Sequence, residues 1–208
     1  LYLSFKADAI QSVKIDWSAQ LKMLKLGIPA GFQILFEVGV FSLSTVLAAR
    51  LGAENLSAHA LVLSIASFTY MIPLGISQAA AIRVGFFYGQ KNMAQATRAG
   101  YACLVLGALI MICFGLVMSL FSRIILGLFT GDEKVISAAL IIIPLVALFQ
   151  IADGLQVVSS GALRGFKETV ISAFVNLAGY WVIALPVSYY LCFVRGLGLF
   201  GLWSGLTV

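Results

Sequence analysis

The chain has 208 residues, of which 62% are hydrophobic and 10% charged, and its mean hydropathy is +1.06. So little polar surface cannot cover a water-soluble domain, which excludes soluble enzymes and binding modules and indicates an integral membrane protein. The net charge of +5 does not indicate a nucleic-acid partner, because the basic residues are scattered singly between apolar runs.

The chain divides into an N-terminal linker and a membrane region. Residues 1–23 are expected to be the end of a preceding apolar segment and a polar linker. Five stretches then have the length and apolarity of a transmembrane helix: 24–49, 57–82, 99–120, 136–161 and 170–193. The last run, 197–208, is too short to cross a bilayer. We therefore expect an all-α membrane protein, a polytopic helical bundle of five full spans and a partial sixth, which is a fragment of a longer chain.

Four prolines lie inside these spans: Pro29, Pro73, Pro144 and Pro186. Proline removes a backbone donor and clashes with the preceding turn, so we expect it to break or bend its helix. Breaks of this kind would allow hinge motions within the bundle.

The basic residues predict the orientation of the bundle. Counting alternate connections, nine lie on the side of the N-terminal segment: Lys6, Lys14, Lys22, Lys25, Arg83, Lys91, Arg98, Arg164 and Lys167. Four lie on the other side: Arg50, Arg123, Lys134 and Arg195. The excess predicts a cytoplasmic N-terminal segment in a multi-pass inner-membrane protein.

Two acidic residues lie inside apolar spans. No other ionisable residue lies within ten positions of Glu37, in the first span, or of Asp153, in the fourth. An acid at the centre of a membrane helix costs about 2.5–3.5 kcal/mol, so such residues usually face an interior cavity and mark an ion or proton pathway. Desolvation favours the protonated form of an unpaired carboxyl, which lets it hold and release a proton.

Both acids are expected at the same depth in the membrane. Glu37 follows Lys25 by twelve residues, and Asp153 precedes Arg164 by eleven. At helical rise these distances are about 18 and 16 Å, close to the midplane of a hydrocarbon layer of about 30 Å. Two separate helices therefore bring a carboxyl to one level.

Polar and aromatic residues share a helix face with each acid. Helical spacing groups Gln33, Phe41 and Ser44 with Glu37, and Phe149, Gln156 and Ser160 with Asp153. Such faces must turn away from lipid, although glutamine and serine often do no more than hydrogen-bond helices together. The predicted coupling-ion residues are Glu37 and Asp153, which would also be the metal ligands of a sodium-coupled protein. The predicted substrate cleft consists of Gln33, Phe41, Phe149, Gln150, Gln156 and Tyr180.

The remaining chemically distinctive residues are expected to be structural. Cys103, Cys113 and Cys192 lie in apolar stretches without metal-ligand spacing, so we expect small buried hydrophobes, no disulfide and no cofactor. His59, at the outer end of the second span, is expected to have an interfacial or capping role, with proton relay as the alternative.

An ordered series of motifs runs through the chain: Lys25-Leu-Gly-Ile-Pro29, Phe36-Glu37, Ala58-His59, Tyr70-Met-Ile-Pro73-Leu-Gly75, Ala80-Ala-Ile-Arg83-Val-Gly85, Phe149-Gln-Ile-Ala-Asp153-Gly-Leu-Gln156, Gly161-Ala-Leu-Arg164-Gly165, Tyr180-Trp181 and Leu185-Pro186. From about Lys22 onward, this series closely resembles the second half of the bacterial multidrug and toxic compound extrusion (MATE) family. The resemblance implies the seventh to eleventh helices of a twelve-helix transporter and the start of the twelfth.

The resemblance also implies a function. MATE proteins export cationic or aromatic drugs in exchange for protons or sodium ions, by alternating access between two six-helix lobes. Glu37 and Asp153 match the acids of the family's C-terminal lobe. Phe149 stands where some sodium-coupled members have tyrosine, so one oxygen of a sodium site is missing. The implied partners are small cationic drugs, membrane lipids and an N-terminal lobe of the same polypeptide.

Two other functions remain as alternatives. A flippase for lipids or lipid-linked oligosaccharides would have a similar bundle, but its cavity is expected to carry several basic residues for a phosphorylated substrate. An intramembrane aspartyl protease would pair two acids on neighbouring helices. The predicted spans contain no cluster of basic residues, and the two acids lie on non-consecutive spans, so export by a non-enzymatic transporter is preferred.

Overall fold

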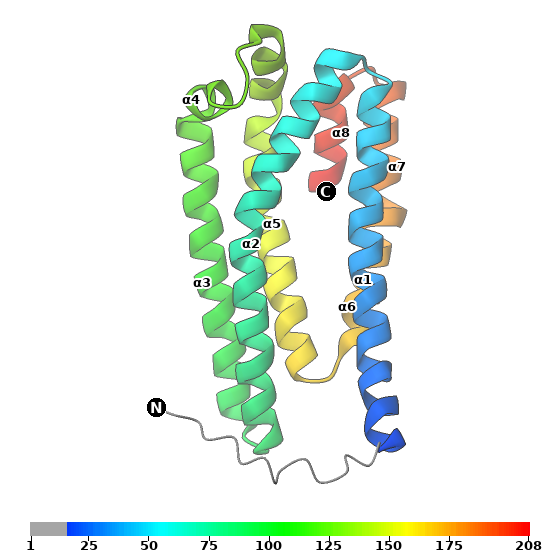
Figure 1. The fold of residues 1–208 in the computed structure, drawn as a ribbon, viewed down its shortest axis with the longest axis vertical. Coiled ribbons are helices and arrows are strands. Elements are labelled where there is room, and N and C mark those ends of the chain that lie inside the picture. The colour runs from blue at the N-terminus through cyan, green and yellow to red at the C-terminus, as the bar shows by residue number, and fades with distance from the viewer. Residues whose placement is uncertain (1–15) are drawn as a thin grey trace, which may run out of the picture.

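The computed structural model describes residues 16–208, which form a bundle of long helices without strands (Figure 1). Its elements are α1 (Trp17–Ala49), α2 (Ala53–Gly89), α3 (Met93–Leu120), α4 (Ser122–Gly127), α5 (Glu133–Gly165), α6 (Thr169–Asn176), η2 (Leu177–Ala184), α7 (Leu185–Tyr189), η3 (Tyr190–Val194) and α8 (Gly198–Thr207). Five helical stretches of this part of the chain are long and apolar enough to cross a membrane. The predicted all-α membrane bundle is confirmed. The apolar segment expected at the N-terminus lies outside the described residues.

The helices extend beyond the apolar stretches that predicted them. α1 begins at Trp17 rather than near residue 24, and α2 continues to Gly89. Side-chain caps set two of the starts: the side chain of Asn92 accepts a hydrogen bond from the Gln95 backbone N–H, and that of Asp132 from the Lys134 N–H. Apolarity predicts the part of a helix that suits hydrocarbon, whereas backbone hydrogen bonds and caps decide where the helix ends.

Three of the four prolines do not break their helices, contrary to the expectation from the sequence. α1, α2 and α5 run without interruption past Pro29, Pro73 and Pro144. A proline frees only one hydrogen-bonding position of the ladder, and the bonds on either side keep the helix continuous. The fifth span is the one that departs from α-geometry, because the π-helical segments η2 and η3 flank the short α7 that contains Pro186.

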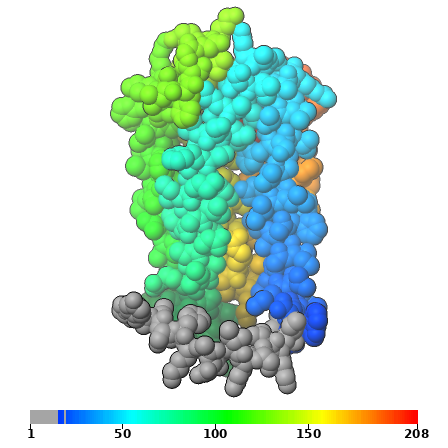
Figure 2. Space-filling view, viewed as in Figure 1, coloured from blue at the N-terminus to red at the C-terminus, as the bar shows by residue number. Residues whose placement is uncertain are grey.

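α5 is the central helix of the bundle and packs against α2, α3 and α8. Glycine permits the closest approach: a Cβ on Gly161 would overlap the Ser77 carbonyl of α2. The Arg164 guanidinium of α5 donates a hydrogen bond to the Ser77 hydroxyl of α2 at 2.7 Å. α1 stands apart from this group, because it packs mainly on α6 and only lightly on α2. In the space-filling view, atoms from the C-terminal part of α5 and the segment that follows are visible in the gap between α1 and α2 (Figure 2).

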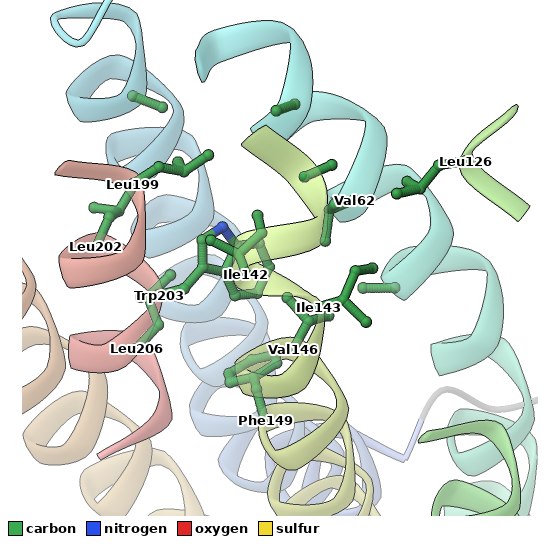
Figure 3. Close-up of a cluster of buried hydrophobic side chains, with 14 of the residues drawn as sticks. Val62, Leu126, Ile142, Ile143, Val146, Phe149, Leu199, Leu202, Trp203 and Leu206 are labelled. Atoms are coloured by element: carbon green, nitrogen blue, oxygen red, sulfur yellow. The ribbon is translucent and has the colours of Figure 1, made fainter. Parts of the chain in front are cut away.

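The main apolar core lies where α8 folds back against α5 and α2 (Figure 3). Trp203 of α8 is fully buried there, beside Phe149 of α5. His59 is also fully buried, with its ring 5.6 Å from that of Trp203. The expected interfacial or capping role of His59 is therefore wrong: α8 covers this position, and the histidine pairs with the Thr45 hydroxyl of α1 at 3.2 Å.

Candidate functional site

Glu37 and Asp153 face one cavity between α1, α2 and α5. This cavity, the main hollow, has a volume of about 350 Å³. Its walls are apolar and aromatic apart from the two carboxyls and a few hydroxyl and amide groups. The structure thus brings together two acids that are 116 positions apart in the sequence.

Glu37 lies on α1 and is partly buried. Its Oε1 accepts a hydrogen bond of 2.8 Å from the Tyr70 hydroxyl of α2. This bond crosses the gap between α1 and α2, two helices that otherwise contact each other little. A hydrogen bond within a protein contributes about 0.5–1.5 kcal/mol to stability, so Tyr70 helps to hold these two helices together.

Asp153 lies on α5 and is only 8% exposed. Its Oδ1 accepts a hydrogen bond of 2.8 Å from the Tyr180 hydroxyl of η2. Asp153 also lines a second hollow of about 190 Å³ between α5, η2 and α8. Each acid therefore holds a tyrosine from a different helix, and Asp153 connects both hollows.

Neither acid has a cationic partner among residues 16–208. The ion pairs of this part of the chain lie on its surface, between Arg123 and Glu133 and between Lys134 and Glu54. A buried acid without a counter-charge is costly when ionised, so it attracts a proton or another cation.

Aromatic side chains surround the two acids. The Phe41 ring contacts Phe149 edge-to-face, with centroids 5.8 Å apart, and lies 6.2 Å from the Tyr180 ring. Phe41 and Phe149 both line the main hollow. Faces of such rings attract organic cations, most strongly where water is excluded.

The predicted cleft residues are divided among three places. Phe41, Phe149 and Gln150 line the main hollow. Gln156 and Tyr180 line the second hollow, where Gln156 donates to the Asn176 side chain.

Gln33, the remaining predicted cleft residue, lines neither hollow. It is buried and donates to Ser160 at 3.0 Å, while its Oε1 accepts from Ser172 at 3.0 Å. These bonds join α1, α5 and α6, which is the structural role that polar residues in membrane bundles often have. Ser44 turns its hydroxyl to the Phe41 carbonyl of its own helix.

Sequence reasoning did not select Tyr70 or Trp181 as site residues. Trp181 donates its indole N–H to the Phe36 carbonyl of α1 at 3.0 Å. Both residues lie within motifs of the chain, and a tyrosine or tryptophan far from a membrane interface needs a hydrogen-bond partner. That requirement is the signal by which they could have been found.

The site offers few ligands for a metal ion. Within the described part of the chain, no group of three His, Cys, Asp or Glu side chains could hold a metal. A cation at the acids would therefore complete its shell with hydroxyl, amide, backbone or water oxygens, as sodium readily does.

Fold and site together define a class: a polytopic helical membrane protein with unpaired acids in an aromatic hollow. A family model described as MatE matches residues 29–190. The chain belongs to the MatE family, which confirms the resemblance seen in the motifs.

Relatives of known description agree with this assignment. A probable multidrug resistance protein NorM from Brucella suis biovar 1 is 36% identical over 197 residues, covering 92% of this chain and 42% of that protein. A probable multidrug resistance protein NorM from Deinococcus radiodurans is 39% identical over 190 residues, covering 89% of this chain and 42% of that protein. The chain thus spans about two fifths of the length of these relatives.

Solved structures have the same architecture. The eukaryotic MATE transporter AtDTX14 superposes with a TM-score of 0.86 at 28% identity, over 99% of this chain and 47% of that one. A MOP superfamily transporter from Pyrococcus furiosus superposes with a TM-score of 0.80 over 89% of this chain and 41% of that one. At 15% identity, the second match supports the fold alone.

Proposed function

We propose that the chain is the C-terminal lobe of a secondary active transporter that exports cationic or aromatic amphipathic compounds in exchange for protons or sodium ions. The observation that carries this proposal is the pair of acids, Glu37 and Asp153, that face one aromatic hollow without a basic partner. The names of the relatives, multidrug resistance proteins, point the same way.

The mechanism is competition for negative charge. An organic cation in the main hollow lies between the acids and the rings of Phe41 and Phe149. Both the negative charges and the aromatic faces attract it. Protons or sodium ions that neutralise Glu37 and Asp153 remove the electrostatic part of that attraction. The compound then leaves on the side to which the hollow is open, and release of the coupling ion on the other side restores the acids.

The coupling ion depends on the oxygen ligands near Asp153. Tyr180 supplies a hydroxyl, but Phe149, which lines both hollows, supplies none. A proton needs only the carboxyl itself, whereas sodium needs several oxygens. Phe149 therefore favours a proton as the coupling ion, with sodium as the second candidate.

Orientation and assembly complete the proposal. The basic residues are in excess beside the start of α1 and beside the ends of α2 and α5. These ends would lie in the cytoplasm, with the lobe in the inner membrane. An N-terminal lobe of the same polypeptide would close the main hollow from the exposed side of α1 and α2. Lipid covers the remaining apolar surface.

The alternative function, a flippase for lipids or lipid-linked oligosaccharides, is less well supported. Neither hollow is lined by lysine or arginine, which a phosphorylated headgroup would require. The two acids would repel such a substrate.

The test uses the full-length protein in vesicles loaded with a fluorescent organic cation. Efflux is measured under an imposed proton gradient and then under an imposed sodium gradient. We expect one of the two gradients to drive efflux, and the double variant Glu37→Gln/Asp153→Asn to abolish it. The exposed acid Glu54 provides the matched control, because Glu54→Gln should leave efflux unchanged. Gradient-driven efflux by the double variant at the wild-type rate would refute the proposal.

A further inference from the structure

The π-helical segment η2 directs two consecutive side chains to two different helices. Tyr180 donates to Asp153 of α5 at 2.8 Å, and Trp181 donates to the Phe36 carbonyl of α1 at 3.0 Å. Phe36 immediately precedes Glu37 in the sequence. One short segment therefore holds one acid directly and the backbone beside the other acid.

The same two residues bracket Glu37 along α1. The Trp181 ring packs edge-on against Phe36 with centroids 6.4 Å apart, on one side of the acid. The Tyr180 ring lies 6.2 Å from Phe41, on the other side. Gly39 makes the approach of Trp181 possible, because a Cβ there would lie 3.0 Å from the indole ring.

π-helical turns are uncommon and often occur at functional sites, where an extra residue in one turn changes which side chains face a neighbour. Tyr180 and Trp181 are linked by a single peptide bond, so they cannot move independently by more than a rotamer change. When η2 moves so that Tyr180 leaves Asp153, the backbone that places the Trp181 indole against Phe36 moves with it.

We propose that Trp181 positions Glu37 and transmits to it the hydrogen-bonding state of Asp153. Binding of a cation at Asp153 competes with Tyr180 for the carboxyl oxygens. The resulting movement of η2 alters the Trp181 contact with Phe36 and so shifts the turn of α1 that carries Glu37. The two acids then respond together although no side chain joins them directly. This inference rests on the proposed transport function, because it describes how the two acids of one site communicate.

The test uses the full-length protein labelled with 5-fluorotryptophan, which keeps the indole N–H. The fluorine resonance of Trp181 is assigned by its loss in Trp181→Phe, and the exposed Trp17 provides a control signal. The neutral amide oxygen of an asparagine accepts from Tyr180 more weakly than a carboxylate does, so we expect Asp153→Asn to shift the Trp181 resonance and to leave that of Trp17 unchanged. In Tyr180→Phe the resonance should become insensitive to Asp153→Asn, because the link to η2 is already broken.

The outcomes separate this inference from the proposed function. If Asp153→Asn abolishes efflux but the Trp181 resonance does not move, the transmission is refuted and the transport proposal stands. If Asp153→Asn transports normally, the proposed function fails and the inference falls with it. A shift that persists unchanged in the Tyr180→Phe background would also refute the inference, because the signal would then reach Trp181 by another route.

A pair of glycine variants tests the positioning role without changing Trp181. Gly39→Ala places a methyl against the indole, whereas Gly31→Ala, two turns earlier in α1, meets no atom within 4 Å. We expect Gly39→Ala to lower the efflux rate about tenfold, equivalent to about 1.4 kcal/mol, with unchanged affinity for the fluorescent cation. Gly31→Ala should change the rate less than about twofold. Equal rates in the two variants would overturn the positioning role.

Discussion

The two acids occupy contrasting surroundings although each accepts a hydrogen bond of 2.8 Å from a tyrosine. Asp153 lies on α5, the most enclosed span of the described bundle, and lines both hollows. Glu37 lies on α1, which is largely exposed, and lines only the main hollow. The tyrosine that holds Glu37 also joins α2 to α1, as the pair of His59 and Thr45 does further along these helices.

We infer from this difference that the two acids have different roles. An acid on a tightly packed helix keeps its geometry when its charge changes, so Asp153 suits the binding of a coupling ion. An acid on a loosely packed helix can move with that helix, so Glu37 suits the coupling of charge to the shape of the hollow. Low packing density is the property expected of elements that move.

Removal of the buried acid should have the largest effect. Asp153→Asn keeps the size of the side chain but removes its charge from the least solvated part of the site. We expect the efflux rate to fall roughly a hundredfold, corresponding to about 3 kcal/mol for a charge-assisted interaction. Vesicle efflux of a fluorescent cation measures the rate, and immunodetection checks the amount of protein in the membrane. Efflux within a factor of two of wild type would remove the basis for assigning ion binding to Asp153.

Removal of the more exposed acid should have a smaller effect. Glu37→Gln keeps an oxygen that can accept from Tyr70, and solvent in the hollow screens the lost charge, so we expect a fall of roughly tenfold, about 1.4 kcal/mol. The same efflux assay compares the two variants. If the efflux rate falls further in Glu37→Gln than in Asp153→Asn, the roles assigned to the two acids would be reversed.

Tyr70, which donates to Glu37, restrains the more exposed helix α1. Tyr70→Phe removes the hydroxyl that ties α1 to α2, whereas Tyr101→Phe alters an exposed tyrosine of α3 and serves as the control. We expect faster amide hydrogen exchange in α1 by about threefold to tenfold, the range for one hydrogen bond of about 1 kcal/mol, with α5 unchanged. Equal protection of α1 in both variants would show that the Tyr70 bond does not restrain this helix.

The smallest expected effect comes from adding an oxygen beside the buried acid. Phe149→Tyr places a hydroxyl next to Asp153 without altering the surroundings of Glu37. We expect half-maximal sodium stimulation of efflux at a concentration lower by about threefold, roughly 0.7 kcal/mol of added ion binding. An unchanged sodium response, with the protein still folded, would show that the oxygen count near Asp153 does not set the ion preference.

The sequence predicts the features that depend on composition along one helix. Long apolar runs predict the spans, and a lone acid in such a run predicts that Glu37 and Asp153 turn inward, as the structure shows. Features that depend on contacts between helices could not be predicted in this way. The pairing of Tyr70 with Glu37 and the burial of Gln33 against Ser160 and Ser172 both depend on which helices become neighbours.

Two other features could not be predicted from the sequence, again because they depend on contacts between helices. His59 lies near the end of an apolar run, which suggests an interface, but α8 folds back and buries it. The π-helical turns around Pro186 lie in a span that packs on α1, α5 and α8, and no residue pattern marks them in advance.

The most direct test of the central claim is equilibrium competition between an organic cation and the coupling ion on the full-length protein. The affinity for a fluorescent cation is measured while the proton or sodium concentration is raised, in wild type and in Glu37→Gln/Asp153→Asn. We predict that the coupling ion displaces the cation from wild type competitively, and that the double variant loses this competition. Simultaneous binding of both cations to wild type, or unchanged competition in the double variant, would contradict a shared site at the two acids.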